Sequence, residues 1–243
     1  EKAMRLNDDV YVLSLPMNYG GETHPLNLSL ILDQANGPTL VDAGLPGQET
    51  LIEAALAEAG VAVRDLRRII ITHQDMDHVG SLHALVEASG ARVLAHTVEI
   101  PYIDGHLRPL KVPSPEMLAQ RPELAALRGR YKPTPVDEPL EDGAHLDLAG
   151  GVRIVFTPGH TPGHMSLYLE RTRTLIAGDA LTAEEGQLHG PSPRPTLDMA
   201  EARRSVRKLA QLAVQTIVCY HSGVVSENAE EQLRRVAEEE SGE

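Results

Sequence analysis

The chain lacks most of the features that mark an exported or membrane protein. Its 243 residues include one cysteine, Cys219, so no internal disulfide can form and a reducing compartment is expected. No apolar run reaches the roughly eighteen residues that a transmembrane helix needs. No basic segment followed by an apolar one opens the chain, as it would in a signal peptide. We therefore expect a cytoplasmic protein without a membrane partner, with Cys219 buried in its short apolar run as a small hydrophobe.

The chain also contains fewer basic residues than acidic ones. Lys and Arg number 22 against 35 Asp and Glu, which gives a formal net charge of −13. A nucleic-acid site needs a broad basic face, so we expect no nucleic-acid partner. Hydrophobic residues make up 42% of the chain, which is enough for a sizeable core.

Glycine and proline divide the chain into short segments with strand or helix patterns. The segments predicted for the first half are strands at 10–15, 28–32, 39–41, 68–72 and 92–95, with helices at 48–59 and 79–89. The segments predicted for the second half are strands at 152–156, 166–169, 174–177 and 216–219, a helix opened by Asp198 and Glu201 that runs to about 213, and a last helix capped by Ser226. This order predicts the α/β class, in one domain that spans residues 1–243.

Residues 97–142 interrupt this pattern with eight prolines. Short helices at 115–120 and 122–129 are expected within it. An irregular stretch of this length in a compact domain is usually functional, so we interpret it as a lid-like insertion, with an exposed spacer as the competing interpretation. Apolar side chains such as Tyr102 and Tyr131 would line a substrate pocket there, and His24 lies in an N-terminal loop that could reach the same cleft.

Side chains that can bind metal follow directly on the predicted strands. Four of them fall within residues 72–78, and the others stand in 157–164, after 174–177 and after 216–219. They are His73, Asp75, Asp77, His78, His160, His164, Asp179 and His221. Strand ends meet at one edge of an α/β sheet, and clustered carboxylates would repel one another without cations. Imidazole and carboxylate ligands around a divalent ion with an open position activate water, so the pattern indicates a metal-dependent enzyme.

The set resembles the metallo-β-lactamase superfamily, with its HxHxDH motif, a later His, an Asp and a final His; the early Val-Asp-Ala-Gly at 41–44 adds to the resemblance. The resemblance implies a four-layered αβ/βα sandwich with two divalent metal ions at one edge. It assigns one ion to His73, Asp75 and His160 and the other to Asp77, His78 and His221. Asp179 would bridge the two, and with Asp77 it would hold the catalytic, nucleophilic hydroxide. Asp42 would orient a ligand, and His164 would support the site without ligating.

Asp75 departs from the family, which usually has His at this position. A carboxylate is a harder, anionic donor, so we expect the site to favour manganese or iron over zinc more than the usual pattern does.

The reaction we favour is hydrolysis of an ester, lactone or thioester carbonyl in a small-molecule substrate. Lactonases of the family carry a tyrosine soon after the bridging Asp, and none follows Asp179 here, so acyl-homoserine lactones are not a specific expectation. The alternatives are an iron-dependent oxidoreductase similar to sulfur dioxygenases, a phosphodiester hydrolase, and a non-catalytic binding protein. If the chain self-associates, we expect a homodimer.

Overall fold

Two sheets stacked face to face form the centre of the molecule, in the computed structural model that describes residues 2–240. The first sheet has the order β1-β2-β3-β4-β5-β6-β7. Its strands are β1 (Ala3–Arg5), β2 (Val10–Tyr19), β3 (Glu22–Ile31), β4 (Thr39–Val41), β5 (Arg68–Ile71), β6 (Arg92–His96) and β7 (Glu138–Leu140). The second sheet has the order β15-β14-β11-β10-β9-β8. Its strands are β8 (His145–Leu146), β9 (Val152–Phe156), β10 (Met165–Leu169), β11 (Thr174–Gly178), β14 (Thr216–Cys219) and β15 (Gly223–Val225).

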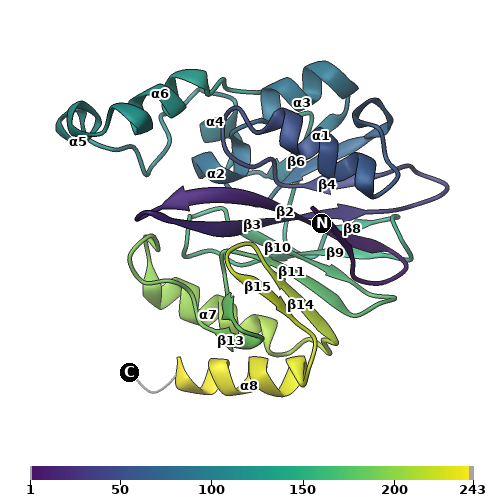
Figure 1. The fold of residues 1–243 in the computed structure, drawn as a ribbon. Coiled ribbons are helices and arrows are strands. Elements are labelled where there is room, and N and C mark those ends of the chain that lie inside the picture. The colour runs from purple at the N-terminus through teal and green to yellow at the C-terminus, as the bar shows by residue number, and fades with distance from the viewer. Residues whose placement is uncertain (1, 241–243) are drawn as a thin grey trace.

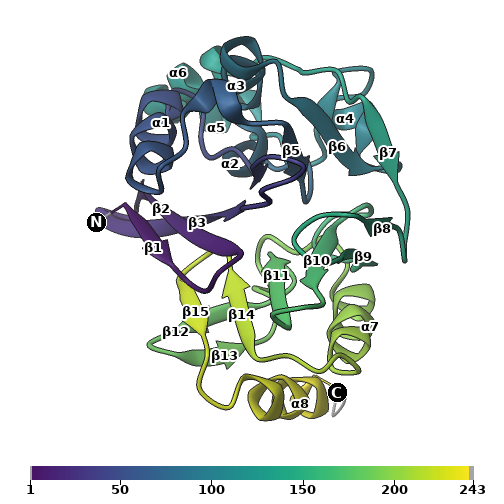
Figure 2. The ribbon, with the colours of Figure 1, turned by 90° about the vertical axis from the view of Figure 1, so that its right-hand side faces the viewer.

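Helices cover the outer face of each sheet, as Figures 1 and 2 show. Over the first sheet lie α1 (Glu49–Glu58), the short α2 (Met76–Val79) and α3 (Leu82–Ser89), with the 3-10 turn η1 (Val63–Asp65) between α1 and β5. Over the second lie α7 (Met199–Leu209) and α8 (Ala229–Glu239), beside the hairpin of β12 (Thr182–Glu184) and β13 (Gln187–His189). No helix within residues 2–240 is long and apolar enough to cross a membrane.

The alternation of side chains along β5 shows how the layers are built. Ile69 and Ile71 pack in the core between the first sheet and its helices, whereas Ile70 packs in the core between the two sheets. A third core joins the second sheet to α7 and α8 through Val206 and Leu233 among others. Because successive residues of a strand face opposite sides, a sheet buried on both faces needs this continuous apolar run. The four-layered αβ/βα sandwich expected from the sequence is therefore confirmed.

Some elements differ from the sequence predictions. The first two strands are longer than the apolar runs: β2 and β3 pair over ten residues each around Gly20 and Gly21, whose φ angles of 63° and 85° suit a tight turn. The helix predicted at 79–89 is broken between α2 and α3. Gly80 lies against the backbone of Pro46 and donates to the Gly44 carbonyl at 2.8 Å, so tertiary contact ends the first turn there.

The last two helices differ in their ends. The side chain of Asp198 accepts from the backbone N–H of Glu201, as the capping pattern predicts, but α7 ends at Leu209 and not at about 213. The prediction that Ser226 caps the last helix is wrong, because α8 begins at Ala229 after Asn228 in the left-handed conformation.

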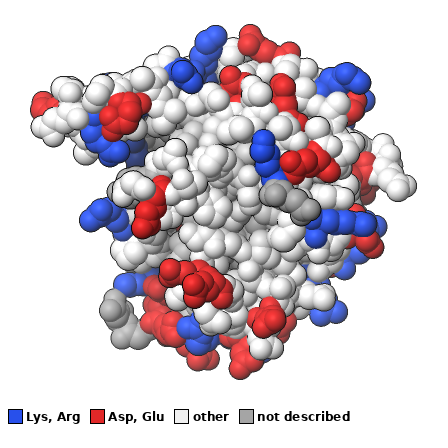
Figure 3. All heavy atoms as spheres, in the orientation of Figure 1, with Lys and Arg blue, Asp and Glu red and all other residues white. Residues whose placement is uncertain are grey.

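The segment 97–142 carries α4 (Ile100–Ile103), α5 (Pro115–Gln120) and α6 (Pro122–Arg130), so the two short helices expected there are present. In Figure 1, α5 and α6 extend beyond the rest of the molecule at the side of α2. The face drawn in Figure 3 carries few charged side chains at its centre, and acidic ones gather at its lower end, around the acidic helix α8.

Candidate metal centre

The predicted ligands converge at one edge of the sandwich. Each of them follows a strand: β5 leads into residues 73–78, β9 into His160, β11 into Asp179 and β14 into His221. Their donor atoms form two groups, and within each group all donors lie within 4.8 Å of one another. The first group contains His73, Asp75, His160 and Asp179, and the second contains Asp77, His78 and His221.

The first group surrounds a space of the size that an ion needs. Nε2 of His160 lies 3.0 Å from Oδ2 of Asp75 and 3.2 Å from Oδ2 of Asp179. Nε2 of His73 lies 3.4 Å from the same oxygen of Asp75. Donors at about 2 Å from a common ion are separated by roughly this much, so the geometry suits a divalent metal.

Asp179 faces both groups. Its Oδ1 lies 3.4 Å from Nε2 of His78, and its Oδ2 lies 3.3 Å from Nε2 of His221. Nε2 of His221 is also 3.2 Å from Oδ2 of Asp77. A carboxylate placed between two sets of donors in this way is suited to bridge two ions.

Three buried polar atoms of these residues have no hydrogen-bond partner: Nε2 of His73, Nε2 of His78 and Oδ1 of Asp179. Buried polar groups in folded proteins are almost always paired, and leaving one unpaired is costly. Three such atoms in one cluster, all of them metal-donor types, fit a bound cation.

In the metal-free protein the electrostatics differ from residue to residue. Although burial lowers them, the neighbouring carboxylates raise the pKa values of His78, His160 and His221, so a bound cation would replace protons on these imidazoles. Burial and the neighbouring His78 lower the pKa of His73, so its imidazole stays neutral. Burial alone would raise the pKa of Asp179, but His221, His78 and His160 hold it well below its usual value. The carboxylate is therefore ionised, the form in which a carboxylate binds a metal ion.

Two buried side chains hold donor residues of the cluster in place, Asp42 through the ring of His78 and His164 through the backbone of Asp179. The carboxylate of Asp42 accepts from Thr72 N and Oγ1 and from Nδ1 of His78, each at 2.8 Å, which leaves Nε2 of His78 facing the cluster. His164 does not face the cluster with a free nitrogen. Its Nε2 accepts from the backbone N–H of Asp179 at 3.0 Å, and its Nδ1 lies 2.9 Å from Thr157 Oγ1. Both residues thus lie where the sequence analysis expects supporting groups.

Glu99 is a supporting residue that the sequence analysis missed. It is fully buried, and its two oxygens accept from the backbone N–H groups of Gln74 and Gly163, each at 2.8 Å. It therefore ties the loop that carries His73 to the loop that carries His160. The signal was available, because Glu99 closely follows the predicted strand at 92–95, just as the ligands follow theirs.

Lys111, also missed, reaches the cluster from the 97–142 segment. Its ammonium donates to Oδ2 of Asp75 at 2.6 Å and lies 2.9 Å from Nε2 of His160. Burial alone would raise the pKa of Asp75, but His73, His160 and Lys111 hold it well below its usual value. Nε2 of His73 still has no partner, so the ammonium lies at the Asp75–His160 edge of the first group and not at its centre.

Two cavities adjoin the cluster and share Asp75. The larger one, of about 660 Å³, is an open cleft over the cluster. It is lined by Met17, Asp75, Asp77, His160, Asp179, Thr182, Ser192, Arg194, Pro195, His221 and Ser222. The smaller one, of about 40 Å³, is lined by Asp75 and Tyr131 among others. His24 and Tyr102 line neither cavity, so their roles in a substrate pocket stay predictions. Cys219 is free and buried, as expected.

Comparison with known proteins agrees with the geometry. The family model described as the metallo-beta-lactamase superfamily matches residues 25–221, a range that includes all seven donors of the two groups. The chain belongs to this superfamily. Its membership confirms the resemblance drawn from the motifs.

Three relatives are similar over most of the chain. The probable metallo-hydrolase YflN of Bacillus subtilis (strain 168) is 32% identical over 198 residues, which cover 75% of this chain and 74% of the relative. The protein YobT of the same organism is 31% identical over 90% of this chain and 92% of its own length. A hydroxyacylglutathione hydrolase of Pseudomonas paraeruginosa is 33% identical over 74% of this chain, a match that spans 56% of that enzyme.

Solved structures give the same answer for the fold. A metallo-beta-lactamase family protein from Thermus thermophilus superimposes with a TM-score of 0.71 at 30% identity, over 97% of this chain and 79% of that one. A metallo-beta-lactamase from Pontibacter korlensis reaches the same TM-score of 0.71 at 13% identity, over 97% of this chain and 98% of its own. At that identity, the second likeness concerns the fold alone.

Proposed function

We propose that the protein is a hydrolase that uses two divalent metal ions to cleave an ester, lactone or thioester. The observation that carries the proposal is the set of buried donor atoms without partners beneath an open cleft. A structural metal site is normally closed by its ligands, whereas a catalytic one keeps an open position. Here Asp75, Asp77, His160, Asp179 and His221 line the cleft, so a substrate has access to the ions.

In this proposal one ion is held by His73, Asp75 and His160, the other by Asp77, His78 and His221, and Asp179 contacts both. When bound, divalent ions lower the pKa of water and polarise a carbonyl oxygen. The chain's own contribution is orientation. Asp42 fixes the tautomer and ring position of His78, and the N–H contact with His164 fixes the backbone of Asp179.

The cleft supports an acyl substrate with an apolar portion. Met17 and Pro195 give it apolar walls, and Thr182, Ser192 and Ser222 offer hydroxyl groups. The similarity to an enzyme named hydroxyacylglutathione hydrolase supports an acyl group as the reacting part. We place this activity in the cytoplasm, consistent with the single cysteine.

The test uses protein stripped of metal and reloaded separately with zinc, manganese or iron. Each form is assayed against panels of lactones, thioesters and phosphodiesters, and the iron form also against a persulfide in air. We expect metal-dependent hydrolysis in the acyl panels and its loss in Asp179→Ala. Hydrolysis that persists in Asp179→Ala, or turnover confined to the phosphodiesters or to the persulfide, would contradict the proposal.

Elemental analysis of protein expressed without added zinc tests the metal preference. Carboxylate donors suit manganese and iron, so we expect one of these ions in the purified protein. Purified protein that contains zinc alone, at full occupancy, would contradict this preference.

A further inference from the structure

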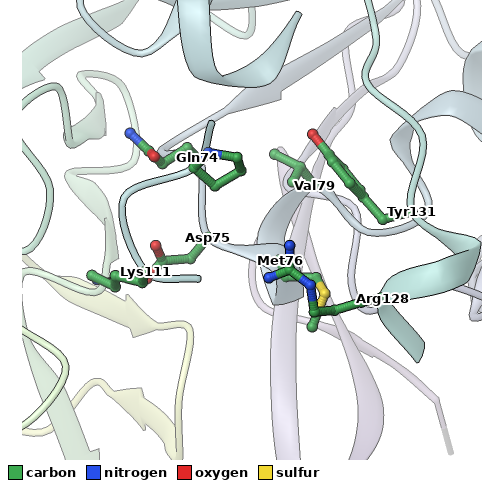
Figure 4. A pocket seen from close by; sticks show the side chains of 8 residues that line it. Gln74, Asp75, Met76, Val79, Lys111, Arg128 and Tyr131 are labelled. Carbon is green, nitrogen blue, oxygen red and sulfur yellow. The ribbon is translucent and has the colours of Figure 1, made fainter. Parts of the chain in front are cut away.

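The smaller cavity beside Asp75 has the features of an anion pocket (Figure 4). Its volume is about 40 Å³. It is lined by Gln74, Asp75, Met76, Val79, Pro109, Lys111, Arg128 and Tyr131. Four of these residues, those from 109 to 131, come from the 97–142 segment, so this segment builds one side of the pocket against the metal-binding loop.

Two cations reach this pocket. Figure 4 shows Lys111 and Arg128 on opposite sides of it, with Arg128 beside Met76. Lys111 is paired with Asp75, the one carboxylate in the lining. Arg128 extends from α6 and is partly buried, and across residues 2–240 no hydrogen bond or ion pair of its guanidinium is found. The pocket therefore holds one positive charge more than its own residues neutralise.

The other walls strengthen an interaction with an anion. Met76, Val79 and Pro109 are apolar and exclude water, which lowers the local dielectric constant and strengthens charge–charge attraction. Tyr131 closes the pocket with its ring, since its hydroxyl donates to the Ile103 carbonyl at 3.5 Å. Lys111 and Arg128 therefore supply the donors for a ligand that can only accept.

The shape of the guanidinium selects the kind of anion. The cavity is small, so it suits a compact anionic group. A carboxylate is planar and matches the fork of a guanidinium with two parallel hydrogen bonds.

We propose that this pocket binds a carboxylate carried by the substrate, while the reacting carbonyl lies in the cleft over the metal centre. Asp75 lines both cavities, so the two ends of a short substrate are separated by one side chain. The substrate class is thus an acyl compound with a free carboxylate a few bonds from the scissile carbonyl. This inference rests on the proposed hydrolase function.

The experiment compares Arg128→Met with a matched control, Arg130→Met, in metal-loaded protein. Arg130 lies two residues further on the same helix and is exposed. The probes are the S-ethyl monothioester of succinic acid, which has a free carboxylate, and its methyl ester, which has none. Thiol release is followed for both, and acetate binding is measured by calorimetry.

We expect Arg128→Met to raise the KM for the carboxylate probe about tenfold or more, because methionine offers neither of the two charge-assisted hydrogen bonds of the guanidinium. The KM for the methyl ester should be the same in Arg128→Met and the wild type. Arg130→Met should have the wild-type KM for both probes. Equal KM values for wild type and Arg128→Met on the carboxylate probe would overturn the proposal while leaving the hydrolase function intact.

The acetate-binding measurement distinguishes the remaining outcomes. If acetate binds in an Arg128-dependent way but the carboxylate probe gains nothing over its ester, the pocket takes a free carboxylate and its assignment to the substrate is wrong. If the wild type cleaves neither probe, the proposed function fails for thioesters, and acetate binding alone decides the pocket. Arg128-dependent binding then supports an anion pocket, and no binding refutes it.

Discussion

Replacing Lys111 by methionine should increase the affinity of the protein for divalent ions. The Lys111 ammonium lies 2.9 Å from Nε2 of His160, the nitrogen that faces the first group of donors. An ion that binds this nitrogen displaces the ammonium from His160, and the contact of Lys111 with Asp75 is a separate one. A hydrogen bond to a charged group is worth about 1.5–3 kcal/mol, so removing this competitor should raise affinity about 10- to 100-fold.

A second effect acts in the same direction. Lys111 neutralises Asp75, and without it the three carboxylates of the cluster have one fewer cation beside them. They attract added cations more strongly. The metal-free variant should also be less stable than the wild type, by about 1–3 kcal/mol, because a largely buried carboxylate loses its ionic hydrogen bond. The side chains of Lys111 and Asp75 are only 21% and 14% exposed, so solvent screens this pair little.

The assay is competition for metal against a chromophoric chelator, with elemental analysis to count bound ions. Thermal unfolding is recorded with and without metal, and the stabilisation by metal should be larger in Lys111→Met than in the wild type. Lys132→Met is the control, since Lys132 is an exposed lysine of the same segment. Unchanged or weaker metal binding in Lys111→Met would refute the competition between ammonium and ion.

Three further outcomes follow from the contacts of the site. Asp42→Asn should weaken metal binding about 10- to 100-fold in the same competition assay, because an amide cannot accept every donor that now approaches the carboxylate, among them Nδ1 of His78. Glu99→Gln should lower the free energy of unfolding by about 1–3 kcal/mol in urea, whereas the exposed Glu87→Gln should not change it. Burial lowers the pKa of His221, but the neighbouring carboxylates raise it to about 10. The protonated His221 therefore stabilises the metal-free fold fully below pH 6.5, and this stabilisation is lost as the pH rises to 10. The unfolding temperature measured in chelator should fall over this window. It should fall less steeply in His221→Gln.

The clustering of the candidate donor residues could be predicted because their positions follow a local rule. Each comes directly after an apolar run such as 68–72 or 216–219, and strand ends of this kind share an edge in any α/β sandwich. Predicting that His73 and His160 lie close together required neither the order of the strands nor the contacts between the two halves of the chain. The charge and donor type of each residue then indicated metal.

Lys111 and Arg128 could not be found in this way. They stand in an irregular, proline-rich segment in which no period relates a side chain to a face. Lys111 meets Asp75 from 36 positions away, through a loop whose path depends on tertiary packing. The break between α2 and α3 has the same origin: helical spacing is continuous there, and the backbone of Pro46 against Gly80 interrupts it.

Lys111 also changes the argument about metal choice. In the proposed two-ion centre, three carboxylates would leave one positive charge on the site, whereas a histidine in place of Asp75 would leave two. The ammonium beside Asp75 restores the second, so the net charge of the site no longer separates this protein from the usual pattern. The preference for manganese or iron then rests on the hardness of the oxygen donor alone. Charge acts on all divalent ions alike, so Lys111→Met should raise the affinities for zinc and manganese by the same factor. Competition titrations with both ions measure this, and a ratio that moves toward one ion would show that Lys111 selects the metal through geometry.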